Sequence, residues 1–146
     1  MTRHCGTINP VIRRYLQLPK AERRDLYSAA WRLLVVRILL LFGIQRSLDW
    51  LGGTAAANPP TPGHTIWQRR AKALRRVGAR LPGVACLARA VALRWWMRAH
   101  GLDARILIGV RPGEDGVASH AWVELEGVPI DDTREHIQAY RVILNG

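Results

Sequence analysis

Cysteine is scarce in this sequence, since only Cys5 and Cys86 occur among its 146 residues. Two cysteines cannot build the dense disulfide framework of a small secreted protein, and they favour a reducing compartment. The first ten residues, MTRHCGTINP, lack the apolar stretch that a secretory signal peptide requires. We therefore expect a cytoplasmic protein.

Long apolar runs are also missing. The longest covers residues 33–44, is interrupted by Arg37, and is shorter than the roughly 20 residues needed to span a bilayer. A buried helix is the favoured interpretation of this run, and peripheral membrane contact is the minor one. The hydrophobic fraction of 49% nevertheless predicts a folded chain, and the length predicts one domain.

Acidic residues are few and unevenly placed. Residues 1–100 contain 18 Lys and Arg against 3 acids, residues 101–146 contain 4 against 8, and the net charge is +11. A basic body of this kind attracts nucleic acid, anionic lipid or an acidic protein. No helix-turn-helix, zinc-finger or RNA-binding motif accompanies the charge, so we expect no nucleic-acid partner.

The first part of the chain has the spacing of amphipathic helices. From Pro19 to about Leu51, apolar residues recur at steps of three and four, which predicts one long helix or two, with a bend at Gly43. The expected inner face consists of Leu26, Ala30, Leu33, Leu34, Leu41, Ile44 and Leu48. We assign residues 1–51 to an N-terminal helical segment and the Pro- and Gly-rich residues 52–65 to a linker.

Two further helices are predicted after this linker. One runs from about Ile66 to Arg80 and ends at the breaker sequence Leu-Pro-Gly of residues 81–83. Its outer face is expected to lie in solvent and, together with Arg23 and Arg24 of the first helix, to dock a partner. This face consists of Arg69, Arg70, Lys72, Arg75, Arg76 and Arg80. The other helix begins near Cys86, ends at Gly101, and is apolar on several sides, which predicts that it is buried.

After Gly101 the pattern becomes that of β-strands. Residues 104–110, 117–125 and 128–130 are rich in β-branched and apolar side chains and are separated by turn sequences. This predicts an antiparallel meander behind a helical front, which is an α+β fold with residues 66–146 as its core.

Three residues of this core have the chemistry of a thiol nucleophile and its partners. Cys86 lies at a helix start, where the thiolate, which is the reactive form, is favoured. His120 lies in the second strand, and Asp132 follows the third. An imidazole takes the proton of the thiol, and a carboxylate fixes the tautomer of that imidazole. The order Cys, His, Asp therefore predicts a small cysteine-nucleophile enzyme.

Each of these residues also has an ordinary structural interpretation. A free cysteine is most often a small buried hydrophobe, and His120 could be a satisfied core histidine. Asp131 competes with Asp132 for the acid position, because the strand register is unknown; we expect Asp131 to face solvent or to cap the segment that begins at Thr133. The other candidates lack metal-ligand spacing and are expected to be structural or incidental: His4, Cys5, His64, His100 and His136. We expect no metal and no cofactor.

Two motifs resemble a known family. Residues 83–90 (GVACLARA) resemble the cysteine helix, and residues 119–124 (SHAWVE) the histidine strand, of the transglutaminase-like leader peptidases of lasso peptide biosynthesis. Asp132 falls where that family has its acid. The resemblance covers about residues 66–140, and it is to the stand-alone form, the lasso peptide B protein C-terminal type, which has no fused winged-helix leader-recognition domain.

The resemblance implies a transglutaminase- or papain-like core and a thiol protease with the triad Cys86, His120 and Asp132. Its substrate would be a ribosomally made lasso peptide precursor, cut between leader and core. The implied partners are this precursor, a separate winged-helix leader-recognition protein and the ATP-dependent lasso cyclase. The backbone N–H of Cys86 would be one oxyanion donor, whereas Arg80 replaces the Gln that papain-like enzymes often have six residues before the cysteine.

Two other functions remain open from the residues alone. The same order of Cys, His and Asp serves acyltransferases of the transglutaminase-like superfamily, in which an amine replaces water as the acceptor. The basic helical front could instead belong to a non-catalytic binding module. Acyl-amine adducts would identify the former, and an inert Cys86 with strongly salt-dependent binding the latter.

Overall fold

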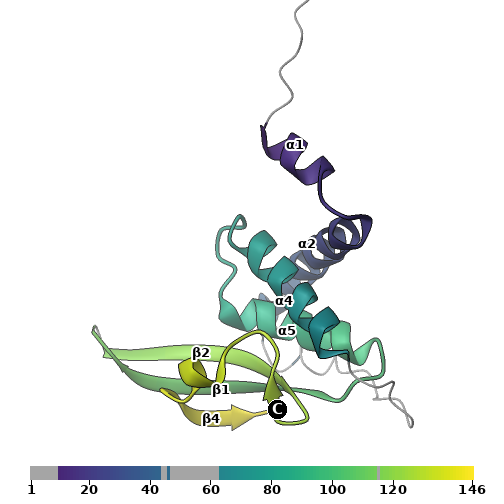
Figure 1. The fold of residues 1–146 in the computed structure, drawn as a ribbon. Coiled ribbons are helices and arrows are strands. Elements are labelled where there is room, and N and C mark those ends of the chain that lie inside the picture. The colour runs from purple at the N-terminus through teal and green to yellow at the C-terminus, as the bar shows by residue number, and fades with distance from the viewer. Residues whose placement is uncertain (1–9, 44–45, 47–62, 115) are drawn as a thin grey trace, which may run out of the picture.

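The computed structural model describes residues 10–43, 46, 63–114 and 116–146. Its helical part consists of α1 (Pro10–Leu16), α2 (Lys20–Leu40), α4 (His64–Gly78) and α5 (Cys86–Arg98). Its second part consists of β1 (Ala104–Gly113), β2 (Gly116–Leu125), β3 (Val128–Pro129), the short helix α6 (Arg134–Ile137) and β4 (Arg141–Asn145). The helices lie on one side of the sheet (Figure 1), and the expected α+β fold is confirmed.

The sheet has four strands in the order β3-β2-β1-β4, and every neighbouring pair is antiparallel. β1 and β2 form a long hairpin in which Gly109 faces His120. β3 is shorter than expected, although the Ile130 N–H still donates to the Val123 carbonyl at 3.0 Å. β4 was not predicted; it adds to the free edge of β1, and its sequence Arg-Val-Ile-Leu has the β-branched character that could have indicated it.

The start of α5 follows from its local sequence. Pro82 and Gly83 break the chain after α4, and Gly83 adopts φ +75°, which a residue without Cβ tolerates best. Cys86 is the first residue of α5, and Gly101, with φ +80°, follows its end. Both helix limits agree with the prediction and leave Cys86 in the first turn.

The core is built around α5, which lies between the sheet and the pair α2 and α4 (Figure 1). Of its thirteen residues, seven are buried, as the apolar character of all its sides predicts. From α2 the core receives Ala29, Leu33 and Val36, each without exposed surface. Residues 10–43 therefore contribute to the same core as residues 63–146.

The expected inner face of the first long helix is only partly correct. Leu33 is buried, but Ala30, Leu34 and Leu41 point to solvent. α2 is apolar on two opposite sides, so the three-and-four spacing alone cannot select the buried one. The helix ends at Leu40, and Gly43 has φ +106°; the expected continuation to Leu51 and most of the linker lie outside the described residues.

The arginine-rich face of α4 is also less free than expected. Arg69 Nε donates to Asp25 at 2.7 Å, and the Arg70 guanidinium packs over Trp67 and Trp96 with centroid distances of 4.5 and 4.8 Å. Asp25 is the one charged residue among the buried side chains of the described part. Its carboxylate draws Arg69 and Arg70 toward α2, and the Arg70 side chain is only 12% exposed, so the expectation that Arg70 faces solvent is wrong. Docking of a partner on the remaining basic side chains stays a prediction.

Among the described residues, no helix is both long enough and apolar enough to cross a membrane.

Candidate active site

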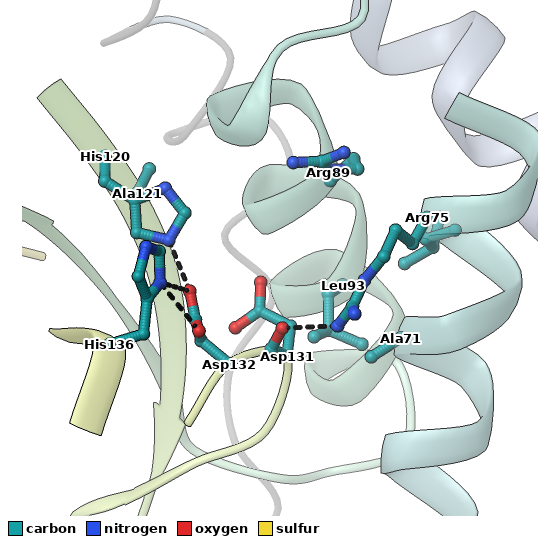
Figure 2. Close-up of a pocket in the computed structure, with 10 residues that line it drawn as sticks. Ala71, Arg75, Arg89, Leu93, His120, Ala121, Asp131, Asp132 and His136 are labelled. Carbon is teal, nitrogen blue, oxygen red and sulfur yellow. Dashed lines mark hydrogen bonds and ion pairs between the residues drawn. The ribbon is translucent and has the colours of Figure 1, made fainter. Parts of the chain in front are cut away.

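A cavity of about 240 Å³ opens between the helices and the sheet (Figure 2). Three elements and the segment after β3 contribute its lining: Ala71, Leu74 and Arg75 from α4, Arg89 and Leu93 from α5, His120 and Ala121 from β2, and Asp131, Asp132 and His136. Both candidate residues His120 and Asp132 therefore face one cavity.

His120 and Asp132 form a close pair at this cavity. The Nε2 atom of His120 lies 2.5 Å from Oδ2 of Asp132. An ionised carboxylate only accepts hydrogen bonds, so Nε2 carries the proton and donates it to Asp132. Within the described chain Nδ1 makes no hydrogen bond, and its lone pair remains able to take a proton. This is the tautomer that a general base opposite a thiol requires.

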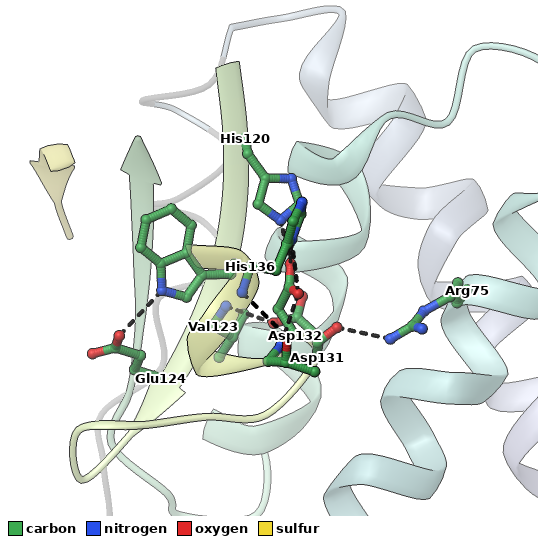
Figure 3. A network of polar contacts seen from close by, with 9 residues as sticks. Arg75, His120, Val123, Glu124, Asp131, Asp132 and His136 are labelled. Carbon is green, nitrogen blue, oxygen red and sulfur yellow. Dashed lines mark hydrogen bonds and ion pairs between the residues drawn. The ribbon is translucent and has the colours of Figure 1, made fainter. Parts of the chain in front are cut away.

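Asp132 is held by two further donors (Figure 3). Nδ1 of His136 lies 2.9 Å from both of its carboxylate oxygens, and the Thr133 N–H donates to Oδ1 at 2.8 Å. Burial alone would raise the pKa of Asp132, but the hydrogen bonds from His136, Thr133 and His120 outweigh it and lower the pKa. Asp132 is therefore kept as an anion beside His120.

Asp131 points elsewhere. Its Oδ1 accepts a hydrogen bond from the Val123 N–H at 2.9 Å, and its backbone carbonyl accepts one from Arg75 Nη2 at 2.8 Å. Desolvation raises the pKa of Asp131 to about 6 in spite of the Val123 hydrogen bond. The expectation that Asp131 faces solvent or caps the next segment is wrong, because β2 needs its carboxylate as an acceptor. The geometry thus leaves Asp132 as the acid beside His120.

An aromatic group supports the imidazole of His120. The buried Trp122 stacks on it with 6.0 Å between centroids and 20° between planes, and the ring of Tyr140 lies 5.3 Å away. Gly109 makes this arrangement possible, since a Cβ at that position would come within 2.7 Å of the Tyr140 Cβ. The close approach of β1, Trp122 and Tyr140 therefore restricts the orientation of His120.

Cys86 stands apart from this pair. It is half-buried against the core at the start of α5, and in the described part of the chain no hydrogen bond joins its Sγ to His120. Arg89, one turn further along α5, lines the cavity instead. Catalytic contacts are often long without substrate and tighten when it binds. The structure thus joins His120 to Asp132. The part of Cys86 as the nucleophile stays a prediction.

The start of α5 also bears on the oxyanion donors. The N–H of Cys86, as the first residue of the helix, has no acceptor within the helix and stays available to a developing negative charge. Arg80 is exposed, and its Nη1 donates to the Arg76 carbonyl at 2.8 Å. That side chain caps the end of α4.

His136 is the site residue that sequence reasoning missed. His136 is not part of a motif with metal-ligand spacing, but it lies four residues after Asp132. Thr133 caps the turn between them, because its hydroxyl oxygen accepts a hydrogen bond from the His136 N–H at 3.3 Å. An acid and a histidine on either side of such a cap could have indicated the contact. One ligand atom each of His120, Asp132 and His136 lies within 4.8 Å of the others, and two imidazoles with a carboxylate are donors that zinc accepts.

The fold and the site define an α+β protein with a histidine-aspartate pair opposite a helix that begins with cysteine. A model of the transglutaminase-like superfamily matches residues 29–145, and the chain belongs to that superfamily. This membership fits a cysteine peptidase or an acyltransferase. No curated protein and no solved structure matches the chain.

Proposed function

We propose that this protein is a cysteine peptidase that removes the leader from a lasso peptide precursor and so frees the N-terminus of the core for macrolactam closure. The observation that carries the proposal is the His120–Asp132 pair, with Nε2 on the acid and Nδ1 unoccupied. Membership of the superfamily supports the thiol chemistry. The motifs around Cys86 and His120, which resemble those of the leader peptidases, support the substrate.

The proposed reaction uses each group in one role. Cys86 gives its proton to Nδ1 of His120, and the thiolate attacks the carbonyl of the scissile peptide bond. The N–H of Cys86 binds the resulting oxyanion, and His120 returns the proton to the leaving amine of the core. A water molecule, deprotonated by His120, then hydrolyses the thioester, which releases the leader as a carboxylic acid and restores the thiol. Asp132 holds the Nε2 proton throughout.

This reaction requires Cys86 and His120 to approach each other when the substrate binds. A cavity of about 240 Å³ accommodates a short segment of the precursor at a time. We propose that a separate winged-helix recognition protein holds the leader, and that the ATP-dependent cyclase receives the freed core, because the motifs resemble those of the stand-alone peptidases. These partners follow from the proposed substrate.

The test is incubation of the purified protein with a lasso precursor, with and without the recognition protein, followed by mass spectrometry. We expect two fragments whose masses sum to the precursor plus one water. Cys86→Ala should give none while keeping its circular dichroism spectrum, and Cys5→Ala serves as the matched control that keeps full activity. Cleavage by Cys86→Ala at the wild-type rate contradicts the thiol mechanism.

A second arm separates hydrolysis from acyl transfer. The same reaction is run with added primary amines, which compete with water for the thioester. Formation of a leader amide in place of the leader acid identifies an acyltransferase and overturns the peptidase assignment. Hydrolysis at an unchanged rate in the presence of the amines supports the peptidase assignment.

A further inference from the structure

The first two helices expose an unusual amount of large apolar surface. On α2 and the turn that follows, Tyr27, Trp31, Leu34, Ile38 and Leu41 are each between 49% and 82% exposed. We call these five residues the outer stripe. They are spaced by four, three, four and three residues, so at 100° per residue they lie within about 80° of the helix circumference and extend over about 21 Å.

The outer stripe is separate from the surface that α2 uses in the fold. Ala29, Leu33 and Val36 lie on the opposite side of the helix and pack into the core with α4 and α5. α1 continues the exposed surface, since none of its residues is buried and Val11, Ile12 and Leu16 are more than half exposed. An apolar patch of this extent on a folded chain marks a binding surface.

The charges around the outer stripe have one sign. The exposed charged residues of α1 and α2 are all basic: Arg13, Arg14, Lys20, Arg24 and Arg37. The two acids of α2 turn toward α4, where Glu22 lies 3.5 Å from Arg76 and Asp25 binds Arg69. A second copy of the chain would bring like charges together at this surface, which opposes self-association.

We infer that α1 and α2 dock on an anionic lipid surface. Apolar side chains with Trp and Tyr among them enter the headgroup region, and the surrounding Arg and Lys bind anionic headgroups; this is the composition of helices that lie in a membrane interface. The inference is independent of the peptidase chemistry.

The fold makes such docking compatible with an open active site. α2 packs on α4 and α5, and the sheet lies on the other side of α5 (Figure 1). The cavity with His120 and Asp132 is formed by α4, α5, the sheet and the segment after β3, without a residue of α2. A protein bound to lipid through the outer stripe therefore keeps this cavity accessible to a peptide in solution.

The experiment is co-sedimentation of the full chain with two kinds of liposome. One consists of phosphatidylcholine alone, and the other contains about one third of the anionic lipid phosphatidylserine. We expect binding to the anionic vesicles that is several-fold weaker at high salt, and little binding to the neutral ones. The variant Trp31→Ser/Leu34→Ser/Ile38→Ser should lose about tenfold or more in affinity. Arg13→Glu/Arg14→Glu/Arg24→Glu should lose a similar factor.

The matched control is Val142→Ser/Ile143→Ser, which removes two exposed apolar side chains from β4 and should bind as the wild type does. Circular dichroism of every variant checks that the fold is kept. Equal binding by the stripe variant and the wild type overturns the inference. A wild type that binds no vesicles, and forms dimers that the stripe variant abolishes, also overturns it in favour of self-association. Since no arm uses peptide cleavage, a failure here is distinct from a failure of the peptidase proposal.

Discussion

At the scale of single residues, the neighbouring Asp131 and Asp132 point to opposite sides of the segment that follows β3. Asp132 accepts the Nε2 proton of His120, whereas Asp131 accepts the backbone N–H of Val123. We expect Asp132→Asn to keep the fold and to lower the rate of precursor cleavage by about 10²–10⁴-fold, because an amide can stabilise the wrong imidazole tautomer. Asp131→Asn should change that rate little. A severe loss in the Asp131 variant with normal cleavage by the Asp132 variant would reverse the two roles.

Asp131 should instead affect stability, with a sign opposite to that of most carboxylates. Its pKa of about 6 in the folded state exceeds the ordinary 3.8, so above pH 6 the folded chain carries a partly desolvated charge that the unfolded chain keeps in water. This penalty disappears as the pH falls from about 6 to below 4. Asn keeps an oxygen acceptor for the Val123 N–H, so Asp131→Asn should gain stability relative to the wild type as the pH rises.

The gain between pH 4 and pH 7 should be on the order of 2–3 kcal/mol in the free energy of unfolding. Urea unfolding of both chains across this range measures it. A difference between variant and wild type that stays constant with pH shows that Asp131 is not desolvated in the fold.

The contact of His136 with Asp132 leads to a prediction about divalent metals. A zinc ion bound by His120, Asp132 and His136 would occupy the base and its acid, so micromolar Zn²⁺ should inhibit precursor cleavage and EDTA should restore it. Zinc could also inhibit by binding the Cys86 thiolate, and a variant of His136 distinguishes that site from the one formed by His120, Asp132 and His136. His136→Ala should raise the inhibitory Zn²⁺ concentration about tenfold, relative to its own uninhibited rate. His100→Ala, whose ring bonds the Trp96 carbonyl, is the control and should leave it unchanged.

At the scale of elements, the close contact of β1 with the segment before β4 positions the aromatic support of His120. A Cβ on Gly109 would meet Tyr140 at 2.7 Å and Trp122 at 3.0 Å. Gly109→Ala should therefore lower the free energy of unfolding by about 1–3 kcal/mol and reduce cleavage, because the rings beside His120 must move. Gly146 also pairs with β1, but a Cβ there would only touch the Leu144 side chain at 3.5 Å, which is an ordinary contact distance. Gly146→Ala should therefore change stability and cleavage little. Thermal unfolding and cleavage rates of the two variants compare them, and equal effects would contradict the packing argument.

At the scale of the whole molecule, the buried Asp25 joins α2 to the rest of the chain. Its Oδ2 binds Arg69 at 2.7 Å, and its Oδ1 lies 3.7 Å from Arg70. Asp25→Ala should destabilise the protein by about 2–3 kcal/mol, somewhat less than for a fully buried pair, because the side chain of Arg69 is 38% exposed. Glu22→Ala breaks the longer and more exposed contact with Arg76 and should cost only a few tenths of a kcal/mol. Denaturant unfolding measures both, and equal losses would show that Asp25 has no special part in attaching α2.

The sequence by itself determined the features that depend on neighbouring residues. Pro82 and Gly83 must interrupt a helix, so Cys86 had to begin the next one. The change from helical spacing to β-rich segments after Gly101 determined the α+β class and the hairpin that carries His120. The division of the chain into a segment, a linker and a core stays a prediction, since residues 47–62 lie outside the described part.

Only the tertiary structure decided what depends on distant contacts. Which aspartate reaches His120 follows from the path of the chain after β3, and a shift of one residue would exchange Asp131 and Asp132. Two sides of α2 are apolar, and only packing against α4 and α5 showed which one is buried. His120 meets the local pair of Asp132 and His136 because the chain after β3 returns beside β2, and β4 is held by pairing with β1. Local spacing contains no information on such contacts, because their free energy comes from groups that are close only after folding.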